Sequence, residues 1–167
     1  MSEEYPFDYG VIPISLYYKK LLQSNNIIAL DEQGWRIQPN TVDFYYLLGI
    51  PEELIEYEPD SISLLPVLIS VQQVDEKPAA FNEVEAEIFY GRIELGDQLD
   101  SIKGMSGGPI FAFHRFENGE LRYFLTALQS RWNRYTGDIA ACPVKLLGDF
   151  LETILLTYSA DSDEYNT

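Results

Sequence analysis

The chain has 167 residues, of which 46% are hydrophobic, so it is long enough for one compact domain with a core and short for two. Its formal net charge of −16 argues against binding to nucleic acids or anionic membranes, because Lys and Arg patches bind phosphate groups. The acidity suits a basic peptide or protein partner, or it serves solubility alone. One cysteine, Cys142, excludes an internal disulfide, and neither a signal peptide nor an apolar stretch of membrane-spanning length is visible, so we expect a cytoplasmic protein.

Apolar patterns in the first half of the chain predict short strands and one helix. Tyr9–Ser15 is an apolar run typical of a buried strand, and helical spacing follows over Leu16–Asn26, where the two asparagines should end the helix. Further strands are expected at Val42–Ile50 and Leu65–Val74. A half-polar strand is expected over residues 84–90. Its mostly apolar positions are Val84, Ala86, Ile88 and Tyr90, and they alternate with Glu85, Glu87 and Phe89.

The second half predicts a hairpin and a helix. The apolar runs Ile110–Phe116 and Leu121–Gln129 flank Asn118-Gly119, the strongest short-range hairpin signal. Pro143 can occupy the first turn of a helix. Apolar residues then recur at helical spacing, namely Val144, Leu147, Leu151, Ile154 and Leu155. Residues 161–167 are acidic and expected to be disordered. These elements predict a mainly-β fold, an antiparallel barrel or sandwich capped by a helix.

The segment Gly104-Met105-Ser106-Gly107-Gly108-Pro109 carries the clearest chemical signal. Acyl transfer needs a serine oxygen at an exposed turn, with backbone N–H groups converging where the oxyanion develops, and glycines permit that backbone. The alternative is a plain glycine-rich turn before a strand. The hexapeptide resembles the nucleophile loop of trypsin/chymotrypsin-like serine proteases. The resemblance implies that Ser106 is the nucleophile and that the amides of Gly104 and Ser106 form the oxyanion hole.

The resemblance continues just upstream of this loop. Residues 100–106 resemble the segment that runs from the base of the specificity pocket to the nucleophile, which places Asp100 as the pocket acid, followed by Ser101. A buried carboxylate there would select Lys or Arg side chains. A solvated loop aspartate is the alternative, and Ile102 stands where trypsin-like pockets have a cysteine.

Downstream, Leu125–Ser130 resembles the strand that pairs with the substrate backbone, so Gln129 and Ser130 are expected at the substrate. Trp132 stands where such enzymes often have a small residue, and would narrow the pocket. Ala140–Val144 resembles the closing strand that leads into the C-terminal helix.

At the other end, Asp8–Ile14 resembles the family's aspartate-plus-strand segment, which implies that Asp8 is the triad acid; a surface acid is the alternative. The resemblance implies an antiparallel six-stranded Greek-key-like barrel of the trypsin-like type, with a short N-terminal crossover helix and a C-terminal helix. Residues 1–40 would hold the N-terminal strand and crossover helix, 41–158 the C-terminal barrel with its helix, and 159–167 an acidic tail. Met105 stands where zymogen-activated members have the acid that pairs with a new N-terminus. Proteolytic activation of that type is therefore not expected.

The catalytic histidine is the main departure from the family. The triad needs an imidazole to take the serine proton, and in the family it comes from the N-terminal barrel, upstream of the aspartate. The one histidine here, His114, lies in a strand that should lead away from Ser106. Lys103 would act as a base only if desolvated, and an exposed, protonated lysine is expected instead. We therefore expect the isolated chain to be inactive.

Several functions remain open from the sequence. The chain is a trypsin-like endopeptidase, or its C-terminal half completed by a His-bearing partner chain or segment, or an inactive barrel that binds a peptide or protein; an unrelated small barrel is a further alternative. A homo-oligomer is an additional way to cover an exposed face. No cofactor is expected, since one Cys and one His make no zinc site and no nucleotide-binding motif is present. The alternating Glu83, Glu85 and Glu87 are expected to form a solvated strand face.

Overall fold

A computed structural model describes residues 12–82, 87–97 and 99–153. Its helices are α1 (Leu16–Ser24), the 3₁₀ turns η1 (Glu32–Gly34) and η2 (Glu52–Leu54), and a helix over residues 144–153. Its strands are β1 (Phe44–Gly49), β2 (Ile55–Tyr57), β3 (Ile62–Leu64), β4 (Val67–Gln73), β5 (Phe89–Ile93), β6 (Pro109–Arg115), β7 (Leu121–Trp132) and β8 (Asp138–Pro143).

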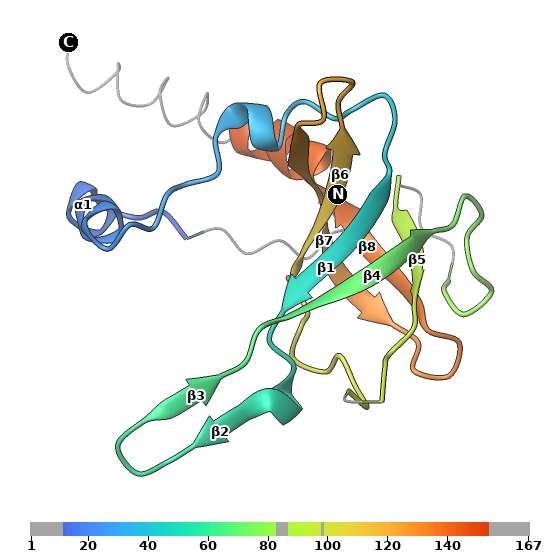
Figure 1. Ribbon diagram of the computed structural model, residues 1–167, viewed down its shortest axis with the longest axis horizontal. Coiled ribbons are helices and arrows are strands. Elements are labelled where there is room, and N and C mark those ends of the chain that lie inside the picture. Colours follow the sequence, from blue (N-terminus) through green and yellow to red (C-terminus); the bar gives the residue numbers. More distant parts are fainter. Residues whose placement is uncertain (1–11, 83–86, 98, 154–167) are drawn as a thin grey trace, which may run out of the picture.

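Six strands close into an antiparallel barrel in the order β1-β4-β5-β8-β7-β6, and the pairing of β1 with β6 completes it (Figure 1). β5 lies beside β8, although β6 and β7 come between them in the sequence, and β6 lies beside β1. This order makes the barrel Greek-key-like. Closure leaves these strands no long unpaired edge, which is the usual solution for a small antiparallel domain. The mainly-β fold, a six-stranded antiparallel barrel with an N-terminal and a C-terminal helix, is therefore confirmed.

The core fills the interior of the barrel. Strand residues with alternate side chains inward form most of it, including Leu47, Ile69, Val71, Ile93, Ile110, Ala127 and Ile139. Ile102 and Met105 join them from the loop between β5 and β6. Outside the barrel, Trp35 packs on Gly148, and a Cβ added to that glycine would lie 2.6 Å from the indole ring. Next to it, Arg36 forms an ion pair with Glu152. These contacts hold the 144–153 helix against the segment around η1.

The hairpin and the end of α1 follow the predicted local signals. Gly119 has φ of +84°, as the Asn-Gly turn requires, and the Phe116 N–H donates to the Glu120 oxygen at 2.8 Å. At the end of α1, Asn26 takes φ of +59° and the Ile27 N–H donates to the Leu22 oxygen at 2.9 Å, a Schellman-type cap.

Two strand predictions need correction. Residues 12–15 of the expected strand Tyr9–Ser15 are exposed and irregular, and its first three residues lie outside the described part. In β5 the inward residue is Phe89, opposite Ala141, which reverses the expected alternation. The pattern misleads because the ring of Phe81 stacks on Tyr90 and makes the outer face apolar as well. The expected Glu83 and Glu85 and the acidic tail lie outside the described residues.

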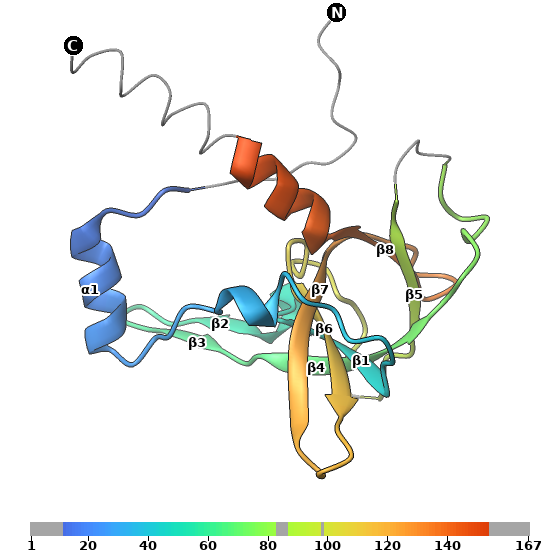
Figure 2. The ribbon, with the colours of Figure 1, turned by 90° about the horizontal axis from the view of Figure 1, so that it is seen from above.

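Two segments project from the barrel. Figure 2 shows α1 at the end of an extended connection, and Figure 1 shows the hairpin of β2 and β3 as an arm. None of the nine residues of α1 is buried, and all six residues of β2 and β3 are exposed except the half-buried Ile55. No helix within the described ranges is both long and apolar enough to cross a membrane.

Candidate functional site

The loop that carries Ser106 is anchored by the residue just before it. Met105 is 2% exposed and inserts into the core, where it lies against Gly49 of β1: a Cβ on that glycine would be 2.7 Å from the Met105 Cε. Gly108 is equally confined, because a Cβ there would be 2.8 Å from the carbonyl oxygens of Leu48 and Met105. With Met105 held inside, the Ser106 side chain is exposed.

Two glycines give the loop its backbone conformation. Gly104 and Gly107 have φ of +91° and +86°, a region that costs other residues about 1–2 kcal/mol. The Gly107 N–H donates to the Gln129 oxygen at 2.7 Å, which ties the loop to β7. Within the described part of the chain, the N–H groups of Gly104 and Ser106 donate no hydrogen bond. An oxyanion hole needs backbone N–H groups that are free to bind the substrate oxygen, and these two amides are free in this sense.

Ser106 lies beside the edge of β7. Its Oγ donates to the Ser130 carbonyl oxygen at 3.4 Å, and the Ser130 Oγ donates to the Ala140 oxygen at 3.2 Å. The register of β7 against β8 shifts between Gln129 and Arg131, which leaves Ser130 in a bulge.

The edge of β7 that faces the loop is open beyond Gln129. β6 begins at Pro109, which pairs with Leu128, and Gly108 then accepts the Gln129 N–H at 2.9 Å. Past this point, no described strand pairs with that side of residues 130–132. The Asn133 N–H donates to the carbonyl oxygen of Asp138 in β8. Because the backbone groups of successive strand residues point to opposite sides, those of the preceding Trp132 point to the open side. An extended peptide could therefore pair with β7 next to Ser106.

Gln129 and Trp132, both expected at a substrate, turn their side chains into the barrel. Gln129 is 4% exposed opposite the core residue Ala141, and Trp132 packs against the core opposite Ile139. The Gln129 Oε1 and the Trp132 Nε1 are buried without a hydrogen-bond partner among the described residues. Of the residues on β7 that were expected at a substrate, only Ser130 is exposed, and it lies next to Ser106. Gln129 follows the inward alternation of Ala127, and the bulge after it, which the sequence pattern did not reveal, brings Trp132 inward as well.

Asp100 and Ser101 lie on the outer part of the same loop. Asp100 is exposed rather than buried, and its N–H donates to the Glu53 Oε1 at 2.8 Å. The Ser101 Oγ accepts the Lys103 N–H at 3.0 Å, a local turn bond. An exposed carboxylate attracts a cationic side chain more weakly than a buried one. Asp100 is therefore not the buried carboxylate that a trypsin-like pocket would need.

Lys103 is braced by η2. Its Nζ lies 2.8 Å from the Glu52 Oε2, and its carbonyl oxygen accepts the Glu52 N–H at 2.8 Å. The hydrogen bond and charge of Glu52 raise the pKa of Lys103, so the ammonium form is favoured. Lys103 is thus an exposed cation, as expected, and not a base for Ser106. Glu52 and Glu53 support the loop from a distant segment, and no local sequence signal pointed to them.

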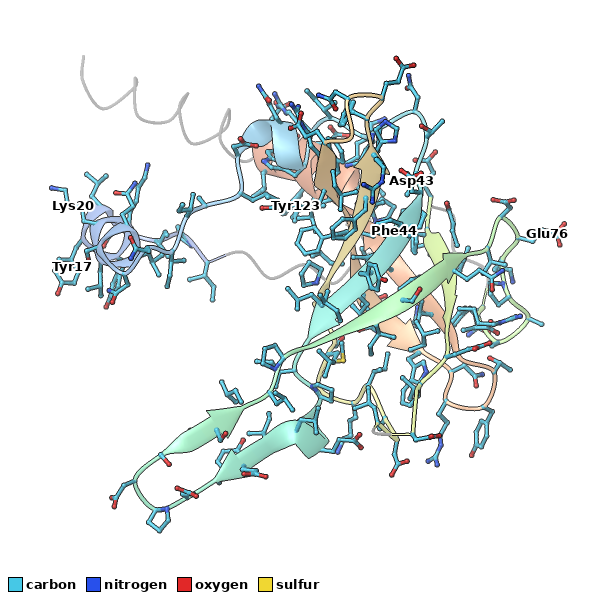
Figure 3. All side chains as sticks on the ribbon, in the orientation of Figure 1. Tyr17, Lys20, Asp43, Phe44, Glu76 and Tyr123 are labelled. Carbon is cyan, nitrogen blue, oxygen red and sulfur yellow. The ribbon has the colours of Figure 1, made fainter. Side chains whose placement is uncertain are left out.

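His114 lies at the other end of the barrel. Its Nδ1 is 3.3 Å from the Thr41 Oγ1 and 3.6 Å from the Asp43 Oδ2. Asp43, labelled in Figure 3, lies just before β1. Glu52, which contacts Lys103 in the Ser106 loop, lies just after β1, so the two contacts are at opposite ends of this strand. A six-residue strand spans about 20 Å, so the imidazole is far outside proton-transfer reach of Ser106.

The remaining site residue, Asp8, lies outside the described residues. Among the residues that the structure describes, no group of three or more His, Cys, Asp or Glu side chains could hold a metal ion. No family model matches the sequence, and neither the curated proteins nor the solved structures contain a match.

Proposed function

We propose that this chain is the nucleophile-bearing barrel of a trypsin-like serine endopeptidase and that its catalytic imidazole comes from a segment or partner outside these 167 residues. The proposal rests on one observation: an exposed Ser106, held by the buried Met105, is flanked by two unused N–H donors and lies beside the open edge of β7. A cleavage site needs these three parts, namely a nucleophile, an oxyanion hole and a strand that aligns the substrate.

In the proposed reaction, the Ser106 Oγ adds to the carbonyl carbon of a peptide aligned on β7, and its proton passes to the supplied imidazole. The negative charge on the carbonyl oxygen faces the amides of Gly104 and Ser106. The tetrahedral intermediate collapses, the C–N bond breaks, and the amine leaves with the proton from the imidazole. Water then hydrolyses the acyl-serine. With His114 at the far end of the barrel, no group among the described residues is placed to take the first proton, and the isolated chain should be inactive.

Labelling with a small fluorophosphonate tests the proposal, with free imidazole as the probe that replaces the missing base. We expect slow labelling of the chain alone and a severalfold faster reaction in imidazole, which follows the fraction of neutral imidazole as pH rises. A positioned base contributes about 10²–10⁴-fold, and a diffusing one should supply a small part of this. Ser106→Ala should abolish the labelling, and Ser63→Ala on the exposed arm should not. Unchanged labelling in Ser106→Ala, or no response to imidazole, would contradict the proposal.

A second function, peptide binding without catalysis, is favoured by the combination of the open β7 edge with the absence of a nearby base among the described residues. Strand addition at this edge uses backbone hydrogen bonds and does not need the Ser106 hydroxyl. Fluorescence anisotropy with a labelled basic peptide separates the two functions. Equal binding to the wild type and to Ser106→Ala, together with no imidazole-dependent labelling, would identify the chain as a binding module.

A further inference from the structure

The helix α1 exposes an apolar face that nothing in the described chain covers. At 100° per residue, Tyr17, Tyr18, Leu21 and Leu22 fall on one side of the helix. Figure 3 shows Tyr17 and Lys20 on the side of α1 that faces away from the barrel. Tyr17 is 70% exposed, and none of the nine residues is buried. Isolated helices shorter than about 12–15 residues are marginal in water, so α1 needs a surface to pack on.

The arm formed by β2 and β3 has the same deficiency. Ile55 pairs with Leu64 and Tyr57 with Ile62, so these four side chains share one face of the ribbon, while Glu56 and Ser63 form the other. The apolar face is open: Tyr57 is 76% exposed and Ile62 62%. A two-stranded hairpin is marginally stable by itself, which makes an uncovered apolar ribbon an unfavourable end state.

The two uncovered surfaces carry opposite charge. Residues 12–30 contain two lysines, Lys19 and Lys20, and no acid, although the whole chain has a net charge of −16. Residues 51–66 contain no Lys or Arg and carry the acids Glu52, Glu53, Glu56, Glu58 and Asp60. The lysines border the apolar face of α1 on its two sides, so a helix lying on the apolar face of the arm would bring them close to Glu58 and Asp60 in the turn between β2 and β3. Opposite potentials on facing patches guide association and fix its orientation.

Within one chain the two surfaces stay apart, since α1 and the arm project from different places on the body (Figure 1). The Schellman-type cap at Asn26 fixes the direction in which the chain leaves the helix. We therefore propose that two copies of this chain form a dimer, in which α1 of each copy covers the apolar face of the β2–β3 arm of the other. A reciprocal contact of this kind closes with two-fold symmetry.

The exposed area is sufficient for such a dimer. Buried aromatic side chains cover about 150–250 Å² each, so Tyr17, Tyr18 and Tyr57 from both copies, all more than half exposed, supply on the order of 800 Å². Leu21, Leu22, Ile62 and Leu64 bring the total into the range of about 1,200–2,000 Å² that stable interfaces bury. The dimer is independent of the proposed function, because Ser106 belongs to neither surface.

The test measures the solution mass of the full chain by sedimentation velocity at micromolar concentration. We expect a dimer for the wild type and a monomer for Tyr17→Ser/Leu21→Ser and for Tyr57→Ser/Ile62→Ser. Ser63→Ala, on the far face of the arm, is the matched control and should remain dimeric. All these positions lie outside the barrel core, so near-ultraviolet circular dichroism should show an unchanged barrel. A monomeric wild type, or a dimer that survives both double substitutions, would overturn the proposal.

Charge exchange identifies the two surfaces as each other's partners. Lys19→Glu/Lys20→Glu alone and Glu58→Lys/Asp60→Lys alone should each weaken the dimer, because each places like charges across both contacts. A mixture of the two variants should dimerise again, since each helix then meets an arm of opposite charge in the mixed pair. Failure of the mixture to dimerise would show that α1 and the arm do not face each other.

Discussion

The packing of Met105 against Gly49 gives the sharpest quantitative test of how the loop that carries Ser106 is held. A Cβ added at Gly49 would lie 2.7 Å from the Met105 Cε and 3.0 Å from its Cγ, and Met105 is 2% exposed. Gly49→Ala should therefore overpack this end of the barrel and lower the free energy of unfolding by about 1–3 kcal/mol. Met105→Ala should lower it by about 2–5 kcal/mol, because it removes buried side-chain atoms and leaves a cavity.

The double substitution is the informative variant. The methyl group that Gly49→Ala adds enters the space that Met105 vacates, so the combined loss should fall short of the sum of the two single losses by about 1 kcal/mol or more. Urea unfolding followed by tryptophan fluorescence gives the free energies. Gly96→Ala combined with Met105→Ala is the control and should be additive, because nothing lies within 4 Å of a Cβ at Gly96. Additivity of the Gly49 and Met105 changes within about 0.5 kcal/mol would refute the packing described here.

Two further expectations concern the loop backbone and the surface charges. Gly104→Ala should destabilise the protein by about 1–2 kcal/mol, since φ is +91° and the added Cβ would lie 3.1 Å from the Glu52 backbone nitrogen. Gly96→Ala, the control, should be neutral or slightly stabilising. Urea unfolding measures both changes. The hydrogen bond from Arg122 lowers the pKa of Glu120 below its ordinary 4.5, so its contribution to stability is present above that pH and lost as pH falls through the folded pKa. Glu120→Gln should therefore reduce stability at pH 7, and the difference from the wild type should shrink as pH falls through the folded pKa of Glu120; a difference that does not change with pH would contradict this.

The elements with strong local signals were predictable from the sequence. The Asn118-Gly119 turn determines how β6 and β7 pair, and Asn25 and Asn26 end α1 where the polar residues follow the apolar spacing. The exposed Ser106 in a glycine-rich turn also agrees with what the loop sequence suggested. These features depend on backbone preferences of a few adjacent residues, which a single sequence displays directly.

Features set by distant contacts could not be predicted. The bulge at Ser130 depends on the register with β8, and it turns Trp132 inward. The strands β2 and β3 are too short for a clear alternating pattern. The contact of Glu52 with Lys103 in the Ser106 loop joins segments about fifty residues apart in the chain. Inward and outward positions in a short strand change with a one-residue shift, so tertiary pairing decides them.

The central claim is that Ser106 and the two amides beside Met105 form one acyl-transfer site, and a peptidyl boronic acid tests it most directly. The Ser106 Oγ should add to the boron, and the tetrahedral adduct should place a boron-bound oxygen at the amides of Gly104 and Ser106. In ¹H–¹⁵N spectra these two amide signals should then shift downfield, while that of Gly96 stays in place and Ser106→Ala shows no adduct. An adduct that leaves both amide signals unmoved, or the same spectra in Ser106→Ala, would contradict the claim.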